Sequence, residues 1–172
     1  MNIVLIGYRG TGKSVVGGLL AARLGMQYVG MDAAIVTRAG MSIPEIVEKY
    51  GWPRFRDIES ELARELGGRD GLIIDTGGGV IERPENIAAL QCNALLVWLK
   101  ASVGTIVSRI QGDTERPSLT TGKTFTEEVA EVLERRTPRY RSAAHCEIDT
   151  DDLTPEQIVD VITGFWKKRI GN

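Results

Sequence analysis

The sequence predicts a three-layer α/β/α fold built on a five-stranded, mainly parallel sheet. Short apolar runs alternate with longer segments of helical period, and this alternation places helices on both faces of a parallel sheet. The predicted strands are Ile3–Ile6, Gln27–Met31, Leu72–Asp75, Ala94–Leu99 and Ala144–Ile148. The predicted helices are Val15–Leu24, Ile43–Tyr50, Pro53–Leu66, Pro84–Leu90, Ser102–Ile110, Phe125–Tyr140 and Pro155–Lys168.

The first predicted helix carries an apolar stripe that we expect to face the sheet. Its members are Val15, Val16, Leu19, Leu20 and Leu24. Their spacing follows the helical period, and Gly25 supplies the residue type that most often ends a helix.

Length and charge predict one domain with small-molecule partners. A chain of 172 residues is near the commonest domain size, and no linker or repeat interrupts residues 1–172. The net charge of −2 removes any general electrostatic attraction to nucleic acid. No apolar run approaches the eighteen residues of a membrane span. We therefore expect a cytoplasmic monomer that binds neither nucleic acid nor membranes.

The two cysteines suggest no chemistry. Cys92 and Cys146 are far apart and show neither a C-x-x-C motif nor a metal-ligand spacing. We expect both to be reduced and partly buried. The single histidine, His145, begins a predicted strand, so we expect it to be packed or hydrogen-bonded rather than to act as a base.

A glycine-rich loop directly after the first predicted strand predicts phosphate binding. Residues 7–14 read G-Y-R-G-T-G-K-S, the pattern of a P-loop between a strand and a helix. Glycines let successive N–H groups turn toward an anion at the positive end of the following helix. In this pattern Lys13 reaches the β and γ phosphates, and the Ser14 hydroxyl is a ligand for Mg²⁺.

Polar residues after other strands predict a cleft opposite this loop. Ligands of open α/β sheets sit beyond the carboxyl ends of the strands. Asp32 follows the second predicted strand, and Asp75 with Thr76 and Gly77–Gly79 follows the third. A run of three glycines lets a ligand approach the backbone closely, although a plain turn would look the same.

Two groups of arginines could bind an anionic acceptor. Arg56 and Glu59 are three residues apart on a predicted helix, so the acid can hold the guanidinium in one rotamer for bidentate carboxylate binding. Most such pairs are surface salt bridges of little energetic weight. The second group is Arg135, Arg136, Arg139 and Arg141. We expect most of this group to be solvated and one member to face the cleft.

The segment 111–124 is predicted to be a mobile loop. It is polar, contains Gly112, Pro117 and Gly122, and has Arg116 as its one arginine.

The ordered set of motifs resembles the shikimate kinases, within the nucleoside-monophosphate-kinase-like P-loop enzymes. The resemblance covers nearly the whole chain. The matching pieces are G-Y-R-G-T-G-K-S, Met31-Asp32-Ala33-Ala34-Ile35, Phe55-Arg56-Asp57-Ile58-Glu59, Thr76-Gly77-Gly78-Gly79, Glu115-Arg116-Pro117 and Arg135-Arg136-Thr137-Pro138-Arg139-Tyr140. The resemblance implies ATP-dependent phosphorylation of the 3-hydroxyl of shikimate on the way to chorismate and the aromatic amino acids, with Mg²⁺ as cofactor.

The same resemblance implies a role for each site residue. Asp32 would bind the acceptor hydroxyl within a substrate-binding region at about 32–62. The segment at about 111–124 would be a lid that brings Arg116 onto the phosphates, and its closure would exclude water as a competing acceptor. The other substrate-binding residues would be Arg56, Gly77, Gly78, Gly79 and Arg136. The nucleotide-binding residues would be Gly10, Thr11, Gly12, Lys13, Ser14, Val15, Arg109, Arg116 and Pro155. Lys13, Asp32 and Arg116 would form the catalytic set.

The chain departs from the family pattern at the metal side. Shikimate kinases commonly carry D-x-D at the end of the second strand, whereas this chain has Gly30-Met31-Asp32, and Val36 replaces an acid. Asp75 ends an apolar strand, as does the acid that holds Mg²⁺ in P-loop enzymes. We hypothesise that Ser14 and Asp75 form the metal side. The alternative is an exposed strand-end aspartate without a metal role.

Two other functions remain open from the sequence. A kinase for another small metabolite, such as gluconate or a nucleotide, would share the phosphate loop but not the set of Arg56, Gly77–Gly79 and Arg136. A nucleotide-binding paralogue with weakened catalysis would explain the change at Gly30. A regulatory GTPase is less favoured because the chain has no N-K-x-D sequence.

Overall fold

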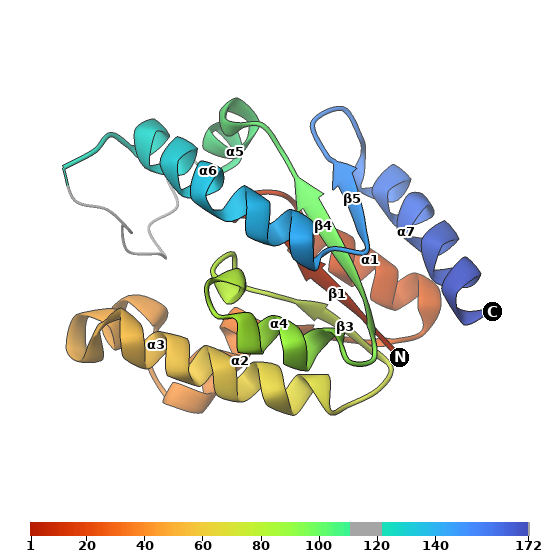
Figure 1. Cartoon of the computed structure of the whole chain (residues 1–172), viewed down its shortest axis with the longest axis horizontal. Helices are drawn as coiled ribbons and strands as arrows, with labels where there is room; N and C mark the ends of the chain where they lie inside the picture. Colours follow the sequence, from red (N-terminus) through yellow and green to blue (C-terminus); the bar gives the residue numbers. More distant parts are fainter. Residues whose placement is uncertain (111–121, 172) are drawn as a thin grey trace.

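The computed structural model describes residues 1–110 and 122–171. Five parallel strands form one sheet in the order β2-β3-β1-β4-β5 (Figure 1). The strands are β1 (Asn2–Ile6), β2 (Gln27–Gly30), β3 (Leu72–Asp75), β4 (Ala94–Lys100) and β5 (Cys146–Asp149). The α/β/α prediction is confirmed, and every strand pair is parallel rather than mainly so.

Helices follow the strands and cover both faces of the sheet. They are α1 (Lys13–Leu24), α2 (Met31–Ala39), α3 (Ile43–Gly67), α4 (Pro84–Gln91), α5 (Val103–Ile110), α6 (Phe125–Ala143) and α7 (Pro155–Ile170), with a short 3-10 turn η1 (Val80–Glu82). Figure 1 shows α1 and α7 on one side of the sheet and α3, α4 and α6 on the other. None of the helices in the described ranges is both long and apolar enough to cross a membrane.

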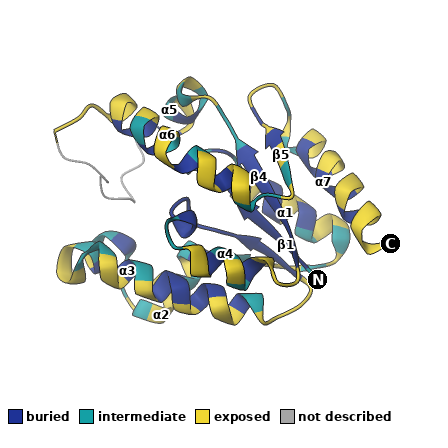
Figure 2. Cartoon of the chain, in the orientation of Figure 1, coloured by how far each residue is buried: buried dark blue, intermediate teal, exposed yellow. Residues whose placement is uncertain are grey.

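Alternating side chains of β1 divide the core into two halves. Ile3 and Leu5 pack with α1 and α7, whereas Val4 and Ile6 pack with the helices of the opposite face. Because the sheet is covered on both sides, all five residues of β1 are buried, and Figure 2 shows the central strands as buried throughout. A smaller cluster around Tyr8 joins α5 to α6. The phosphate-binding loop therefore leaves a strand that is rigidly held.

The first helix buries only part of its predicted stripe. Val16 and Leu20, four residues apart, are buried against the sheet, whereas the exposed fractions of Val15 and Leu19 are 58% and 37%. The prediction was wrong for these two residues. Val15 sits in the first turn, where the helix meets a cavity rather than the sheet.

The third helix is two helices joined at a kink, as the two predicted segments imply. Gly51 has φ 81° and ψ 166°, a conformation that favours glycine, and Pro53 follows it. Ser42 and Glu45 form a capping box at the N-terminus. The second half of α3 then runs along the sheet and carries Arg56 and Glu59.

Three smaller predictions can be compared with the structure. The last strand begins at Cys146 rather than at Ala144, because Ala144 caps α6. The Nδ1 atom of His145 accepts a hydrogen bond from the Leu96 N–H, so the prediction of a hydrogen-bonded histidine is confirmed. Cys146 is partly buried, as predicted. Cys92 is exposed after α4, so that prediction was wrong.

Gly67→Ala is expected to lower the free energy of unfolding by about 2 kcal/mol. A Cβ atom there would lie 2.3 Å from the backbone oxygen of Ala89, so α3 and α4 would have to separate. Gly18→Ala is the control, because no atom lies within 4 Å of that Cβ position; it should raise stability by about 0.5 to 1 kcal/mol. Urea unfolding measures both, and equal stabilities of the two variants would contradict the expectation.

Candidate active site

The phosphate-binding loop connects β1 to α1 and is shaped by its glycines. Gly7 has φ 143°, and a Cβ atom there would lie 2.3 Å from the backbone oxygen of Leu99. Gly12, with φ 91°, caps α1 in a left-handed conformation. The loop therefore ends at a helix N-terminus, where backbone N–H groups and the helix dipole favour an anion.

Lys13 folds back over this loop. Its Nζ atom donates hydrogen bonds of 2.9 Å to the carbonyl oxygens of Gly7 and Tyr8. These bonds hold the ammonium group at the mouth of the loop, where a bound triphosphate would meet it. The loop is closed further by Thr11, whose hydroxyl donates to the Tyr8 carbonyl at 2.8 Å.

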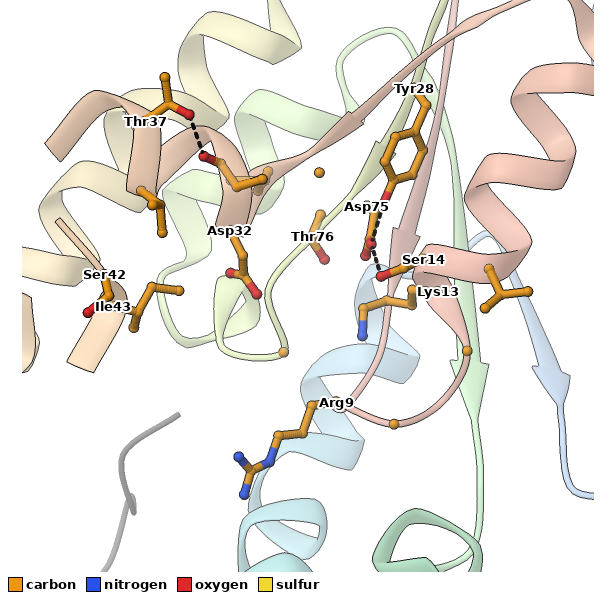
Figure 3. Close-up of a pocket in the computed structure, with 18 of the residues that line it drawn as sticks. Arg9, Lys13, Ser14, Tyr28, Asp32, Thr37, Ser42, Ile43, Asp75 and Thr76 are labelled. Carbon is orange, nitrogen blue, oxygen red and sulfur yellow. Dashed lines mark hydrogen bonds between the residues drawn. The ribbon is translucent and has the colours of Figure 1, made fainter. Parts of the chain in front are cut away.

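Asp75 accepts two hydrogen bonds at the end of β3. The Ser14 hydroxyl donates to its Oδ2 atom at 2.6 Å, and the Tyr28 hydroxyl donates to the same atom at 2.9 Å (Figure 3). Asp75 is buried, so the expected exposure in the alternative interpretation was wrong, while the metal role of this aspartate stays a prediction. Burial, followed by the charge of Asp75, raises the pKa of Tyr28 to about 12. Tyr28 therefore remains a hydrogen-bond donor at neutral pH.

A cavity of about 890 Å³ lies beyond the carboxyl ends of β1, β2 and β3. The phosphate loop forms one wall and the start of α2 with the α2–α3 connection forms the other, including Asp32, Ser42 and Ile43. Asp32 lies in the first turn of α2, and Figure 3 shows its carboxylate and the Lys13 ammonium group on opposite sides of the cavity. Residues that the sequence separates by 19 positions therefore face one shared space.

Arg56 is fixed against the glycine turn that follows β3. Its Nη1 atom contacts Glu59 Oε2 at 2.8 Å, and the exposed fractions of the two side chains are 14% and 1%. The guanidinium also lies over the rings of Trp52 and Phe55. A Cβ atom on Gly79 would fall 2.1 to 2.4 Å from the guanidinium atoms, so glycine there is what admits this arginine.

Glu59 is a buried acid whose charge depends on its neighbour. Burial raises its pKa above the usual value, and the charge and hydrogen bond of Arg56 oppose that rise. The pair is therefore a buried salt bridge rather than the weakly stabilising surface pair that the spacing alone would allow.

Arg136 is the one member of the second arginine group that is buried. Its Nε atom contacts Glu82 Oε1 at 2.6 Å, and the exposed fraction of its side chain is 4%. Arg135 and Arg139 contact the same carboxylate at 3.0 and 2.8 Å, with half-exposed side chains. Glu82, on η1, therefore forms ion pairs with three arginines, one of which is buried.

The buried Arg136 and the partly buried Arg56 lie against the glycine turn, although neither arginine is among the residues that line the cavity. A Cβ atom on Gly78 would lie 3.5 Å from Arg136 Nη1, and Gly78 itself lines the cavity. The Tyr140 hydroxyl, on α6, donates to the Gly78 carbonyl oxygen and so holds the turn in place. Arg56 and Arg136 thus lie beside the turn rather than in bulk solvent, as two guanidinium groups for one anion would require.

Glu82→Gln is expected to reduce the decrease in the free energy of unfolding that occurs at acidic pH. Burial alone would raise the pKa of Glu82, but the hydrogen bonds and charges of Arg136 and Arg135 outweigh it and leave the pKa below its ordinary 4.5. A depressed folded-state pKa stabilises the fold above the unfolded pKa, and the stabilisation is lost as pH falls through the folded pKa. Wild type should therefore lose more stability between pH 5 and pH 3 than the variant.

Denaturant unfolding at pH 7, 5 and 3 checks this expectation. Glu61→Gln, at an exposed position of α3, is the matched control, and its stability should decrease between pH 7 and pH 3 as much as that of the wild type. Parallel losses in wild type and Glu82→Gln would mean that Glu82 is not coupled to its arginines.

Arg109 joins three segments near the loop. Its Nη1 atom donates to the Gly10 carbonyl and the Thr150 hydroxyl, both at 3.2 Å, and its Nη2 atom donates to the Thr150 carbonyl at 3.3 Å. Thr150 leads from β5 toward Pro155, the first residue of α7. Arg109 therefore contacts the phosphate loop directly, whereas neither Arg109 nor Pro155 is among the residues that line the cavity. Arg116 and most of the predicted lid lie outside the described residues.

Four residues of this region were not predicted from the sequence to belong to the site. Arg9 lines the cavity and lies over Phe125, Tyr28 contacts Asp75, Glu82 holds Arg136, and Tyr140 holds the Gly78 carbonyl. Only Tyr28 had a usable signal: it lies two positions before Gly30 on a strand, so both face the same side. The others depend on contacts between distant segments.

The fold and the site together define a P-loop kinase. The sheet is parallel, and a glycine-rich loop at the end of β1 leads to Lys13 and Ser14 at the start of the next helix. A cavity for the acceptor lies opposite this loop. The family model described as shikimate kinase matches residues 9–167. The chain belongs to the shikimate kinase family.

Relatives and solved structures agree along the whole chain. A shikimate kinase from Geobacter sulfurreducens is 46% identical over 167 residues, 97% of this chain and 91% of the relative. A structure of shikimate kinase from Acinetobacter baumannii in complex with shikimate has a TM-score of 0.92 and 32% identity, covering 98% of this chain and 93% of that one. Shikimate kinase from Aquifex aeolicus has a TM-score of 0.83 and 29% identity, with both chains fully covered.

A more distant neighbour shares the fold alone. A gluconokinase from Sinorhizobium meliloti has a TM-score of 0.58 and 18% identity, covering 92% of this chain and 87% of that chain. Family membership therefore favours the shikimate kinase interpretation over a kinase for gluconate or another small metabolite.

Proposed function

We propose that the protein transfers the γ-phosphoryl group of ATP to the 3-hydroxyl of shikimate, giving shikimate 3-phosphate and ADP, as a cytoplasmic, monomeric enzyme. The observation that carries the proposal is the pair of arginines, the partly buried Arg56 and the buried Arg136, beside a glycine turn that faces the phosphate loop. Two fixed guanidinium groups suit the carboxylate of shikimate, since guanidinium binds carboxylate through paired hydrogen bonds.

On the donor side, the loop binds the phosphates of ATP. The residues we assign to the nucleotide are Gly10, Thr11, Gly12, Lys13, Ser14, Val15, Arg109, Arg116 and Pro155. Lys13 opposes charge on the phosphoryl oxygens, and Arg116 adds a second positive charge from the segment 111–124. Phosphoryl transfer is accelerated mainly by positioning and charge stabilisation, so these residues supply most of the donor-side catalysis.

On the acceptor side, the carboxylate lies against Arg56 and Arg136, and the ring lies over Gly77–Gly79. Asp32 then accepts a hydrogen bond from the 3-hydroxyl and takes its proton as the new P–O bond forms and the bond to ADP breaks. Its place across the cavity from Lys13 supports this orientation of the two reactants.

Ser14 and Asp75 fit the protein side of a magnesium site. Both present hard oxygen atoms, they are 2.6 Å apart, and they adjoin the loop that would hold the phosphates. No group of three acidic, histidine or cysteine residues that could hold a metal occurs in the described ranges, which suits an ion bound chiefly through phosphates and water. When bound, Mg²⁺ neutralises charge on the β and γ phosphates.

Asp75→Asn should raise the Mg²⁺ concentration for half-maximal activity by about tenfold, the weight of one charge-assisted contact. Asp149→Asn, at the end of β5, is the strand-end control and should leave the Mg²⁺ titration unchanged. Unchanged magnesium dependence in Asp75→Asn would remove Asp75 from the metal side.

The central test is a transfer assay with ATP and shikimate, with and without Mg²⁺. We expect ADP release only when shikimate is present, and no comparable release with gluconate or nucleoside monophosphates. ATP binding without transfer to shikimate would instead favour a paralogue that has lost catalysis.

A further inference from the structure

Tyr28 occupies a space that two glycines leave open. A Cβ atom on Gly17 of α1 would lie 2.7 Å from Tyr28 Cε2, and one on Gly30 would lie 3.4 Å from the Tyr28 hydroxyl. The ring therefore lies between the first helix and its own strand, in what we call the Tyr28 seat, bounded by Gly17 and Gly30. Glycine at position 17 is what admits the ring this close to α1.

From this seat the hydroxyl reaches the neighbouring strand. Gly30 is the register partner of Asp75, and the Tyr28 side chain passes over Gly30 to donate to Asp75 Oδ2 at 2.9 Å. The same oxygen accepts from Ser14 at 2.6 Å. Figure 3 shows the three side chains in a row, with Tyr28 at the far end from the loop.

Two donors on one carboxylate oxygen restrict how the carboxylate can turn. Asp75 ends its strand and is followed by Thr76, whose hydroxyl donates to the Leu5 carbonyl oxygen rather than to Asp75, and then by the glycine turn. The two hydrogen bonds that the Asp75 carboxylate accepts therefore come from other segments. Tyr28 supplies a rigid ring with a single terminal donor, which loses little conformational freedom when it forms this bond. The hydroxyl is thus placed to fix the carboxylate next to Ser14.

We propose that Tyr28 is a positioning residue for the metal side of the site: seated between Gly17 and Gly30, it holds the Asp75 carboxylate toward Ser14 and the magnesium-bearing phosphates. The proposal rests on the assignment of Ser14 and Asp75 to the metal side made above. It explains how a chain with glycine at position 30 keeps a fixed carboxylate at this edge of the sheet.

The test measures metal preference by binding rather than by turnover. Calorimetry gives the ADP dissociation constant with Mg²⁺ and with EDTA, and the ratio of the two is the metal preference. Tyr28→Phe keeps the ring and removes the hydroxyl, so we expect the metal preference to fall about three- to tenfold, the effect of one hydrogen bond to a charged group, while ADP affinity in EDTA stays within about twofold. Tyr50→Phe, at an exposed tyrosine of α3, should leave both values unchanged.

A second pair of variants moves the ring without altering it. Gly17→Ala should push Tyr28 out of its seat and lower the metal preference as Tyr28→Phe does. Gly18→Ala, the next residue of the same helix, has open space at its Cβ position and should retain the wild-type preference.

Two outcomes with Tyr28→Phe overturn the proposal. One is an unchanged metal preference in Tyr28→Phe, and the other is an equal loss of affinity in Mg²⁺ and EDTA, which would mark Tyr28 as merely structural. Unchanged preference in Asp75→Asn overturns it as well, because the carboxylate would then not serve the metal. Transfer to shikimate by the wild type tests the proposed function separately, since these binding ratios do not depend on the acceptor.

Discussion

Asp32→Asn is expected to lower kcat for shikimate phosphorylation by about 10² to 10⁴, the usual contribution of a positioned general base. The amide keeps the size of the side chain and its place in the first turn of α2, so the cavity should keep its shape. The amide cannot accept the proton of the 3-hydroxyl as the P–O bond forms. KM for ATP should change less than about threefold, because Asp32 lies on the wall opposite the phosphate loop.

Steady-state kinetics at saturating ATP and Mg²⁺ measure the effect, and circular dichroism checks the fold. Asp152→Asn, an exposed aspartate between β5 and α7, serves as the control and should keep wild-type rates. Wild-type kcat in Asp32→Asn would remove this carboxylate from proton transfer.

Arg136→Lys is expected to lower kcat/KM for shikimate by about 10² with little change in KM for ATP. Lysine keeps the positive charge beside Glu82, so the partly buried acid keeps a cation at this position. It lacks the planar fork that grips both carboxylate oxygens, and losing one to two charge-assisted hydrogen bonds costs about 2 to 4 kcal/mol.

Arg141→Lys provides the matched comparison on the same helix, because its side chain is 63% exposed. We expect that variant to behave as the wild type for both substrates. If Arg136→Lys and Arg141→Lys have the same kcat/KM, the buried arginine does not bind the acceptor. If KM for ATP rises as much as KM for shikimate, the change acts through the shape of the cavity instead.

Local spacing predicted most of the elements that build the site, but it missed α2 (Met31–Ala39), which carries Asp32, and wrongly placed Met31 in the second strand. Apolar runs separated the strands from the helices, and the glycine-rich loop with Lys13 and Ser14 fell where β1 meets α1. The pair Arg56 and Glu59 was predicted on a helix and is found there as a buried salt bridge. Such features are local, because residues within one helical turn or one tight loop are brought together by the backbone itself.

The first helix marks the limit of this reasoning. Helical spacing grouped Val15 with Val16, yet only Val16 is buried, since the start of the helix borders a cavity that no periodicity reveals. The arginine group of α6 is a second case. Spacing alone could not predict which member of this group is buried. Arg136 is the buried one, and it is hydrogen-bonded to Glu82, which lies more than fifty residues away in the chain.

By itself the sequence determined that this protein has a phosphate loop at the head of a parallel α/β sheet and acidic and basic groups at the strand ends. The tertiary structure alone decided which of those groups are fixed: Asp75 by Tyr28 from the next strand, and Arg136 by Glu82 from the turn after β3. The physical reason is that strand register and helix packing, not sequence separation, set the distance between side chains on different elements.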